Sequence, residues 1–184
     1  NMNIKENATE YQFKLASTKE DFIKIHKLNY DTFVEEIPQH TSNDNGVLVD
    51  IFHDKNLYFI CLKGEKLVGM VAVNAMPPFS LEMKLDNLND YLPRIDGVCE
   101  IRLLSIAKEY RKGKVIRGLL TVLGRYCLNK NYKLARISGN VIEQRMYHKL
   151  GFVNFGPTVG TEVAKYQPMY LTLEDLSKRF KDLD

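Results

Sequence analysis

The chain has 184 residues, and 45% of them are hydrophobic, which is enough to bury a core without disulfides or a metal. Its net charge of +3 is too mild for a nucleic-acid-binding protein, whose basic side chains are usually concentrated. The apolar runs are shorter than a membrane span and no signal peptide is recognisable, which indicates a cytoplasmic protein. We therefore expect one domain over residues 1–184, either complete or cut from a longer polypeptide.

The cysteines argue against disulfides and metal sites. Cys61, Cys99 and Cys127 are odd in number, lie far apart and have apolar neighbours, so we expect buried reduced thiols. No spacing of His and Cys residues suggests metal ligands. We therefore predict that the protein has no metal.

The first half of the chain predicts a strand, a helix and a hairpin. Residues 11–15 alternate enough to form a strand. The sequence Ser17-Thr18-Lys19-Glu20 resembles a capping box that opens a helix, and this helix should end before Pro38. Segments 57–62 and 67–74 are rich in strand-forming residues around a short turn, which predicts a hairpin.

The second half alternates strands with helices. We expect strands at 98–106, 134–138, 152–155 and 169–173, and helices within 80–91, at 114–130, at 142–150 and from about 172 onward. The order β-α-ββ-β-α-β-α-ββ indicates an α/β (α+β) protein with a mixed sheet.

A strand, loop and helix between Glu100 and Leu120 form the first candidate site. The first turn of a helix that starts near Lys114 has unpaired N–H groups and the positive end of the helix dipole, so it can hold a phosphate. Arg111, Lys112, Lys114 and Arg117 add positive charge. The alternative is that these side chains form an ordinary solvated face.

A second segment carries a family resemblance. Asn140 after a strand, Tyr147 on the following helix and Leu150-Gly151-Phe152 at its end resemble the GNAT superfamily in order and spacing. Leu104-Ser105-Ile106 and Tyr110-Arg111 resemble the superfamily's strand and loop. The resemblance covers about residues 57 to 155.

The resemblance implies a GNAT-like mixed, mostly antiparallel sheet flanked by helices, and an N-acyltransferase that moves an acyl group from a CoA thioester to a primary amine. Acetyl-CoA is the expected donor, and another acyl-CoA is the alternative. The donor would lie along the strand 98–106, where the N–H of Leu104 or Ile106 polarises its carbonyl. The donor-binding residues so implied are Leu104, Ser105, Ile106, Arg111, Lys112, Gly113, Lys114, Val115, Ile116, Arg117 and Asn140.

The loop departs from the family pattern. Counted from Arg111, the two positions that usually hold small residues hold Lys114 and Ile116, and Gly113 lies one residue away. Either Gly113 supplies part of the close approach to the pyrophosphate, or the loop is less tight, as in relatives that use longer acyl donors.

A further likeness points to such relatives. Tyr30 to Glu36 resembles the N-terminal segment of acyl-homoserine-lactone synthases and N-acyl amino acid synthases, and Glu100-Ile101-Arg102 resembles their Glu-x-x-Arg strand with the Arg one residue closer. The likeness implies Glu36 and Arg102 as substrate-binding residues. It also adds an acyl carrier protein as an alternative source of the acyl group.

Tyr147 and Glu100 are the candidate catalytic residues. A phenol can protonate a departing thiolate and yet hold its proton at rest, so Tyr147 is the expected general acid; the alternative is a packed core tyrosine. Glu100 and Arg102 share one face of a strand, where they form a structural ion pair, or Glu100 accepts the proton of the amine. Arg136 is interpreted as ordinary sheet content and His148 as a surface residue.

Two functions remain open. The first is the N-acyltransferase, with a small-molecule amine as its partner; the second is an acyl-CoA-sensing domain without activity, which the missing loop glycines favour. We expect neither nucleic acid nor a membrane span among the partners. The sequence does not indicate the acceptor, the acyl length or the oligomeric state.

Overall fold

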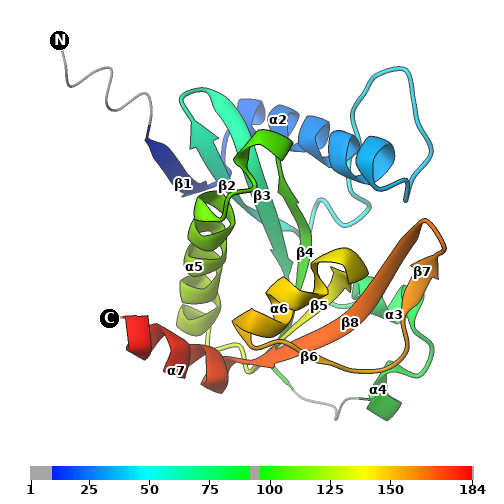
Figure 1. Cartoon of the computed structure of the whole chain (residues 1–184), viewed down its shortest axis with the longest axis vertical. Helices are drawn as coiled ribbons and strands as arrows, with labels where there is room; N and C mark the ends of the chain where they lie inside the picture. Colours follow the sequence, from blue (N-terminus) through cyan, green and yellow to red (C-terminus); the bar gives the residue numbers. More distant parts are fainter. Residues whose placement is uncertain (1–9, 92–95, 184) are drawn as a thin grey trace. The chain divides into compact units, whose positions relative to one another are not determined.

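The computed structural model describes residues 10–91 and 96–183 of the chain. Its elements run from β1 in blue to α7 in red (Figure 1). The strands are β1 Tyr11–Leu15, β2 Leu57–Lys63, β3 Lys66–Asn74, β4 Val98–Ile106, β5 Leu134–Asn140, β6 Val153–Asn154, β7 Val159–Thr161 and β8 Ala164–Thr172. The helices are α2 Lys19–Tyr30, η1 Asp31–Glu36, α3 Ser80–Lys84, α4 Leu88–Tyr91, η2 Lys108–Tyr110, α5 Lys114–Asn129, η3 Val141–Glu143, α6 Gln144–Leu150 and α7 Leu173–Leu183.

The strands confirm the predicted fold class. Within the described residues they pair in the order β1-β2-β3-β4-β5-β8-β6, and β7 pairs with β8. The chain divides into two compact units. The first unit holds the described residues up to Ala72 together with Leu103–Leu123, and the second holds Val73–Arg102 and the residues from Gly124 onward.

The helix α2 covers one face of the strands in the first unit. Ile25 and Leu28 of α2, three positions apart on one helix face, pack with Tyr58 and Ile60 of β2 and with Met70 of β3 in one apolar cluster.

The start and end of this helix differ from the sequence expectation in detail. Its capping box is formed by Thr18 and Asp21, one residue later than predicted from Ser17 and Glu20. After Tyr30 the chain continues as the π-helix η1, and it leaves helical geometry at Ile37, as expected before Pro38.

Two glycines allow close packing between α5 and the strands of the first unit. A Cβ atom on Gly69 of β3 would lie 2.7 Å from Cγ1 of Val115, and one on Gly118 of α5 would overlap the ring of Phe13. Because no side chain stands between them, the first half of α5 lies directly on these strands, and Leu119 is fully buried there.

In the second unit, β5 lies between β4 and β8. It pairs in parallel with β4 from Val98 opposite Leu134 to Ile101 opposite Ile137, and antiparallel with β8 over its whole length. The strand β8 starts at Ala164, five residues before the predicted start at Met169, because Pro168 breaks the strand pattern in the sequence.

Some element bounds differ from the sequence prediction, and the state of the cysteines agrees with it. The sequence did not predict β7, the strand β5 runs two residues past its predicted end at Ser138, and α6 begins at Gln144 after the short turn η3. Cys61, Cys99 and Cys127 are buried free thiols, as predicted.

Candidate functional site

The loop between β4 and α5 has the geometry that the sequence predicts for a helix-start site. The N–H of Ala107 donates to the carbonyl of Val68 at 2.9 Å, which anchors the loop, and Gly113 turns the chain with a φ of 102°. No atom lies within 4 Å of a Cβ on Gly113, so the glycine serves the left-handed backbone and not a close packing contact. The N–H of Arg117 donates to the carbonyl of Gly113 in the first turn of α5.

The side chains around this turn divide by burial. Val115 faces inward and is 1% exposed, whereas the cationic side chains of Lys112, Lys114 and Arg117 are exposed. This exposed basic turn at a helix start can hold an anionic group.

Arg111 makes different contacts from those the sequence suggests. Its guanidinium donates two hydrogen bonds of 2.6 Å to the carboxylate of Glu36, and its Nε donates to the carbonyl of Ile106 at 2.8 Å. The Arg111 hydrogen bonds hold the pKa of Glu36 below its usual value. Arg111 therefore links η1 to the end of β4. Glu36, for which substrate binding is predicted, is the residue of η1 that pairs with Arg111.

The end of β4 is distorted at Leu103. This residue has a φ of 57°, which is rare for a leucine and marks an irregular strand of the kind often found beside active sites. The hydroxyl of Ser105, two residues on, is buried without a hydrogen-bond partner. The sequence carries no signal for this distortion, because leucine has no preference for positive φ.

Tyr147 lies on the side of α6 that packs against β5. A Cβ on Gly139 would lie 2.9 Å from Cδ2 of its ring, and the ring of Phe152 meets it edge-on at 5.9 Å. Its exposed fraction is 4%. Burial, reinforced by the charges of Glu143 and Tyr166, raises the pKa of Tyr147 well above its ordinary value, so the phenol is protonated at neutral pH.

The end of α6 is fixed by Gly151. This residue takes the left-handed conformation that closes a helix, and the N–H of Phe152 then donates to the carbonyl of Tyr147 at 3.1 Å. The Leu-Gly-Phe ending noted in the sequence thus fixes the last helical turn, which carries Tyr147. Asn140 is the last residue of β5.

The carboxylate of Glu100 is buried, accepts two backbone hydrogen bonds and forms an ion pair. The backbone N–H groups of Ser80 and Leu81 donate to its two oxygens at 2.9 and 3.0 Å, and Nε of Arg102 lies 3.3 Å away. The predicted ion pair between Glu100 and Arg102 is confirmed. Glu100 also anchors the start of α3, a contact that the sequence could not indicate because the partners lie about twenty residues earlier.

Arg136 is not ordinary sheet content, contrary to the sequence interpretation. Its guanidinium stacks on the ring of Phe79 at 4.6 Å from the centroid, and its side chain is 9% exposed. Only its position opposite Glu100 in the parallel register could have signalled this arrangement, and the register is not readable from the sequence.

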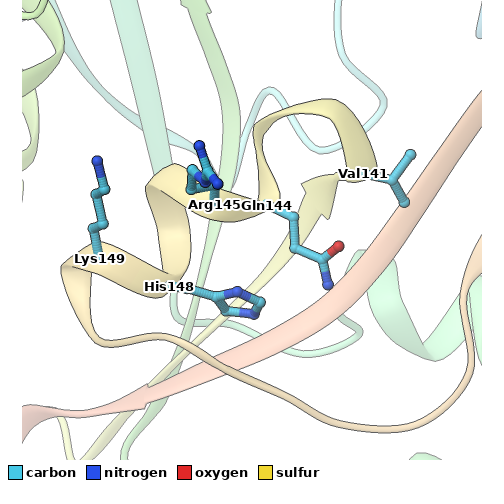
Figure 2. Close-up of a pocket in the computed structure, with 5 residues that line it drawn as sticks. All are labelled: Val141, Gln144, Arg145, His148 and Lys149. Carbon is cyan, nitrogen blue, oxygen red and sulfur yellow. The ribbon is translucent and has the colours of Figure 1, made fainter.

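An open hollow of about 570 Å³ lies along the outer side of α6, lined by Val141, Gln144, Arg145, His148 and Lys149 (Figure 2). His148 is exposed, as predicted, and hydrogen-bonds Asn154 at 2.8 Å. Tyr147 lines no part of this hollow, because neighbouring helix positions face different directions.

The comparisons with known proteins decide the family. The model of the acetyltransferase (GNAT) family matches residues 22–152, which is most of the chain. The chain belongs to the GNAT acetyltransferase family. No curated protein sequence matches it at significance.

Solved structures share the fold of this GNAT protein at low identity. A putative N-acetyltransferase from Lactobacillus plantarum is 18% identical with a TM-score of 0.66, over 89% of this chain and 98% of that one. The CoA-dependent acyl-homoserine lactone synthase BjaI, solved with SAM and isopentyl-CoA, is 19% identical with a TM-score of 0.75, over 92% and 89%. FeeM, an N-acyl amino acid synthase from uncultured soil microbes, is 14% identical with a TM-score of 0.69, over 91% and 94%.

The described residues also bear on metal binding and on membrane spans. In the part of the chain that the structure describes, no group of three His, Cys, Asp or Glu side chains is arranged to hold a metal ion. Over residues 10–91 and 96–183, no helix has the length and apolar character needed to cross a membrane.

Proposed function

We propose that this GNAT protein transfers an acyl group from a CoA thioester to the primary amine of a small molecule, with acetyl as the expected group and Tyr147 as the general acid. The observation that supports the proposal most is the position of Tyr147 on α6, within a segment that follows the family pattern from Asn140 to Phe152. The protein so proposed acts in the cytoplasm.

The proposed reaction needs one proton at a defined place. The amine nitrogen attacks the thioester carbonyl carbon and loses a proton to a base, the carbon–sulfur bond breaks, and the thiolate takes a proton from the phenol of Tyr147, whose phenolate regains one from water. A thiol has a pKa near 8.5 and a phenol one near 10, so Tyr147 stays protonated until a thiolate forms beside it. Burial raises the pKa of Tyr147 further, so the phenol holds its proton more firmly at rest and gives it to the thiolate less readily.

The donor-binding part of the proposal rests on the basic turn at the start of α5. Lys112, Lys114 and Arg117 are exposed and meet the phosphates of CoA, and the backbone of Leu104 or Ile106 polarises the thioester carbonyl. Arg111 contributes through Glu36 and the carbonyl of Ile106, because it fixes the end of the strand.

Glu100 is the carboxylate proposed to take the proton of the amine, directly or through water. Its oxygens already accept hydrogen bonds from the N–H groups of Ser80 and Leu81 and pair with Arg102, so any such proton must reach an oxygen that keeps its structural partner. The bonds favour a water-mediated route.

A longer acyl chain is the second candidate donor. Lys114 and Ile116 stand where the family loop has small residues, and the distorted strand at Leu103 adds to the irregularity of this region. A longer acyl-CoA or an acyl carrier protein is then the source of the acyl group.

Thiol release tests the proposal. Purified protein is incubated with acetyl-, butyryl- and octanoyl-CoA, or with an acylated carrier protein, and with a panel of primary amines, and the acylated amine is identified by mass. We expect thiol and product in equal amounts for at least one pair. Tight donor binding without release above the donor-only rate for any amine would contradict the enzyme and favour an acyl-CoA sensor.

A further inference from the structure

Residues 48–56, which precede β2, lie against α2 through a pair of histidines. The ring of His53 meets the ring of His26 on α2 at 4.8 Å between centroids and at an angle of 70°. Two hydrogen bonds hold the same residues: the N–H of Leu48 donates to the carbonyl of His26 at 2.9 Å, and the side-chain amide of Asn29 donates to the carbonyl of Leu48 at 2.9 Å. All of these residues belong to the first unit.

His53 ends a chain of hydrogen bonds that has a fixed direction. The amide nitrogen of Asn56 donates to Oδ2 of Asp50 at 2.7 Å and to the hydroxyl oxygen of Tyr58 at 3.2 Å. Nδ1 of His53 lies 3.1 Å from the same hydroxyl. Because the oxygen of Tyr58 accepts from Asn56, its own proton is available to Nδ1 of a neutral His53. Tyr58 is 2% exposed, so little water reaches this hydroxyl.

His26 is also suited to the neutral form. Its Nδ1 is buried and has no hydrogen-bond partner. In a neutral imidazole this atom can carry no proton, whereas in the cation it is an N–H donor that needs an acceptor. Burial and, in second place, the charge of His53 lower the pKa of His26. The attached state therefore accommodates a neutral imidazole better than a cation.

The side chains around the pair come from α2, from residues 48–56 and from β2. The titratable ones that adjoin it are Lys27 and Tyr30 of α2, Asp50, Asp54 and Lys55 of residues 48–56, and Tyr58 of β2. Asp50 helps to fold residues 48–56, since it also accepts from the N–H of Phe52 at 3.1 Å. The ammonium of Lys55 lies over the ring of Phe52 at 4.7 Å, and the ring of Phe22 meets that of His53 edge-on at 5.5 Å. The two imidazoles thus lie largely among rings, and burial there favours their neutral forms.

We propose that His26 and His53 form a proton-sensitive latch, which holds residues 48–56 on α2 while both imidazoles are neutral and releases them when either takes up a proton in mild acid. A proton on Nδ1 of His53 reverses its hydrogen bond to Tyr58, whose oxygen then faces two donors. A proton on His26 creates a buried N–H donor beside the other imidazole. The inference does not depend on the proposed acyl transfer.

The pH range of release follows from the direction of the shift at His26. Because the pKa of His26 is lower in the attached state than in the released state, release takes up a proton. The latch is therefore fully stable above the ordinary histidine pKa of about 6.5 and weakens as the pH falls below it. One proton makes release more favourable by up to about tenfold between pH 7.5 and pH 5.5.

Amide hydrogen exchange on the full chain at pH 7.5 and pH 5.5, corrected for the intrinsic exchange rate at each pH, measures the release. We expect the opening equilibrium of residues 48–56 to rise about 3–10-fold at the lower pH, while that of β5 in the other unit, the reference, changes by less than about twofold. Equal protection of residues 48–56 at both pH values, or a rise no larger than that of β5, would overturn the proposal.

Substitutions then assign the effect to the two histidines. His26→Phe and His53→Phe each keep an aromatic ring but cannot take up a proton, so at least one of them should remove most of the pH dependence. His40→Gln, at an exposed histidine before residues 48–56, is the matched control and should keep the wild-type dependence. Full pH dependence in both phenylalanine variants, or its loss in His40→Gln, would overturn the latch. Thermal unfolding at pH 7.5 checks that each variant folds; if neither phenylalanine variant folds, the wild type and His40→Gln decide.

Discussion

The two faces of β5 are stabilised by different kinds of interaction. Toward α6 the strand presents Ile137 and Gly139, and its contacts there with Tyr147 are packed and apolar. Toward α3 it presents Arg136 and Ser138, whose surroundings are charged and whose hydrogen bonds are incomplete. Because side chains alternate in direction along a strand, the seven residues of β5 form one packed face and one polar face.

The difference matters for the proposed acyl transfer because the proposed acid lies on the packed face. The dry environment of Tyr147 raises the pKa of its phenol, which therefore stays protonated until a thiolate forms. The polar face is held instead by the carboxylate of Glu100, which binds the start of α3 and pairs with Arg102. On this account the packed face supplies the acid, and the polar face anchors α3 through Glu100.

The largest effect on stability is expected where the polar face is anchored. Glu100→Ala leaves the N–H groups of Ser80 and Leu81 and the guanidinium of Arg102 without their carboxylate, so the free energy of unfolding should fall by about 3–5 kcal/mol. Denaturant unfolding measures this loss, and the double variant with Arg102→Ala should cost less than the sum of the two single changes.

The exposed pair of Glu20 and Lys24 gives a matched control for this anchor. Their charges lie 3.4 Å apart at the surface, so Glu20→Ala should cost no more than about 0.5 kcal/mol. A similar loss for the buried and the exposed pair, or strict additivity of Glu100→Ala and Arg102→Ala, would show that Glu100 does not anchor the polar face.

On the packed face, Gly139→Ala should cost about 1–3 kcal/mol of unfolding free energy, because the new methyl group would lie 2.9 Å from the ring of Tyr147 and 3.2 Å from the sulfur of Met169. The neighbouring change Ser138→Ala, on the polar face, removes a hydroxyl without a partner and should be nearly neutral for stability. If the two changes were equally costly by denaturant unfolding, the assignment of the two faces would be wrong.

The start of α5 is a third region, which belongs to neither face of β5. The double change Lys112→Glu and Lys114→Glu reverses charge at the start of α5 and should weaken CoA binding by about 1–3 kcal/mol in calorimetry. Lys130→Glu, just after the other end of α5, is the control and should not weaken it. Unchanged CoA affinity in the double variant would show that the start of α5 does not bind the phosphates of CoA.

How much of this could be predicted from the sequence depends on the distance along the chain between partners. The helix α5 and the glycine that closes α6 were predicted because periodicity and Gly151 are local signals. The contact of Glu100 with Ser80 and the placement of Arg136 beside it depend on long-range register. Propensity also says nothing of the π-helix η1 or of the positive φ at Leu103, which tertiary packing imposes.

The same limit applies to the candidate site. Tyr147 was found because it lies in a short, recognisable segment, and the basic turn at Lys112 and Lys114 because a helix start is legible in sequence. The partner of Arg111 was missed, since Glu36 lies 75 residues away.

The most direct test of the account is a single-turnover measurement on Tyr147→Phe. The change removes the phenolic oxygen and its proton but keeps the ring between Gly139 and Phe152, so the fold and the CoA affinity should be nearly unchanged. The rate of acyl transfer should fall about 10²–10⁴-fold, and by less at high pH, where a free thiolate leaves more readily. Tyr132→Phe, at a half-buried tyrosine of the same unit, should keep the wild-type rate. A wild-type single-turnover rate for Tyr147→Phe would show that Tyr147 is only a core residue.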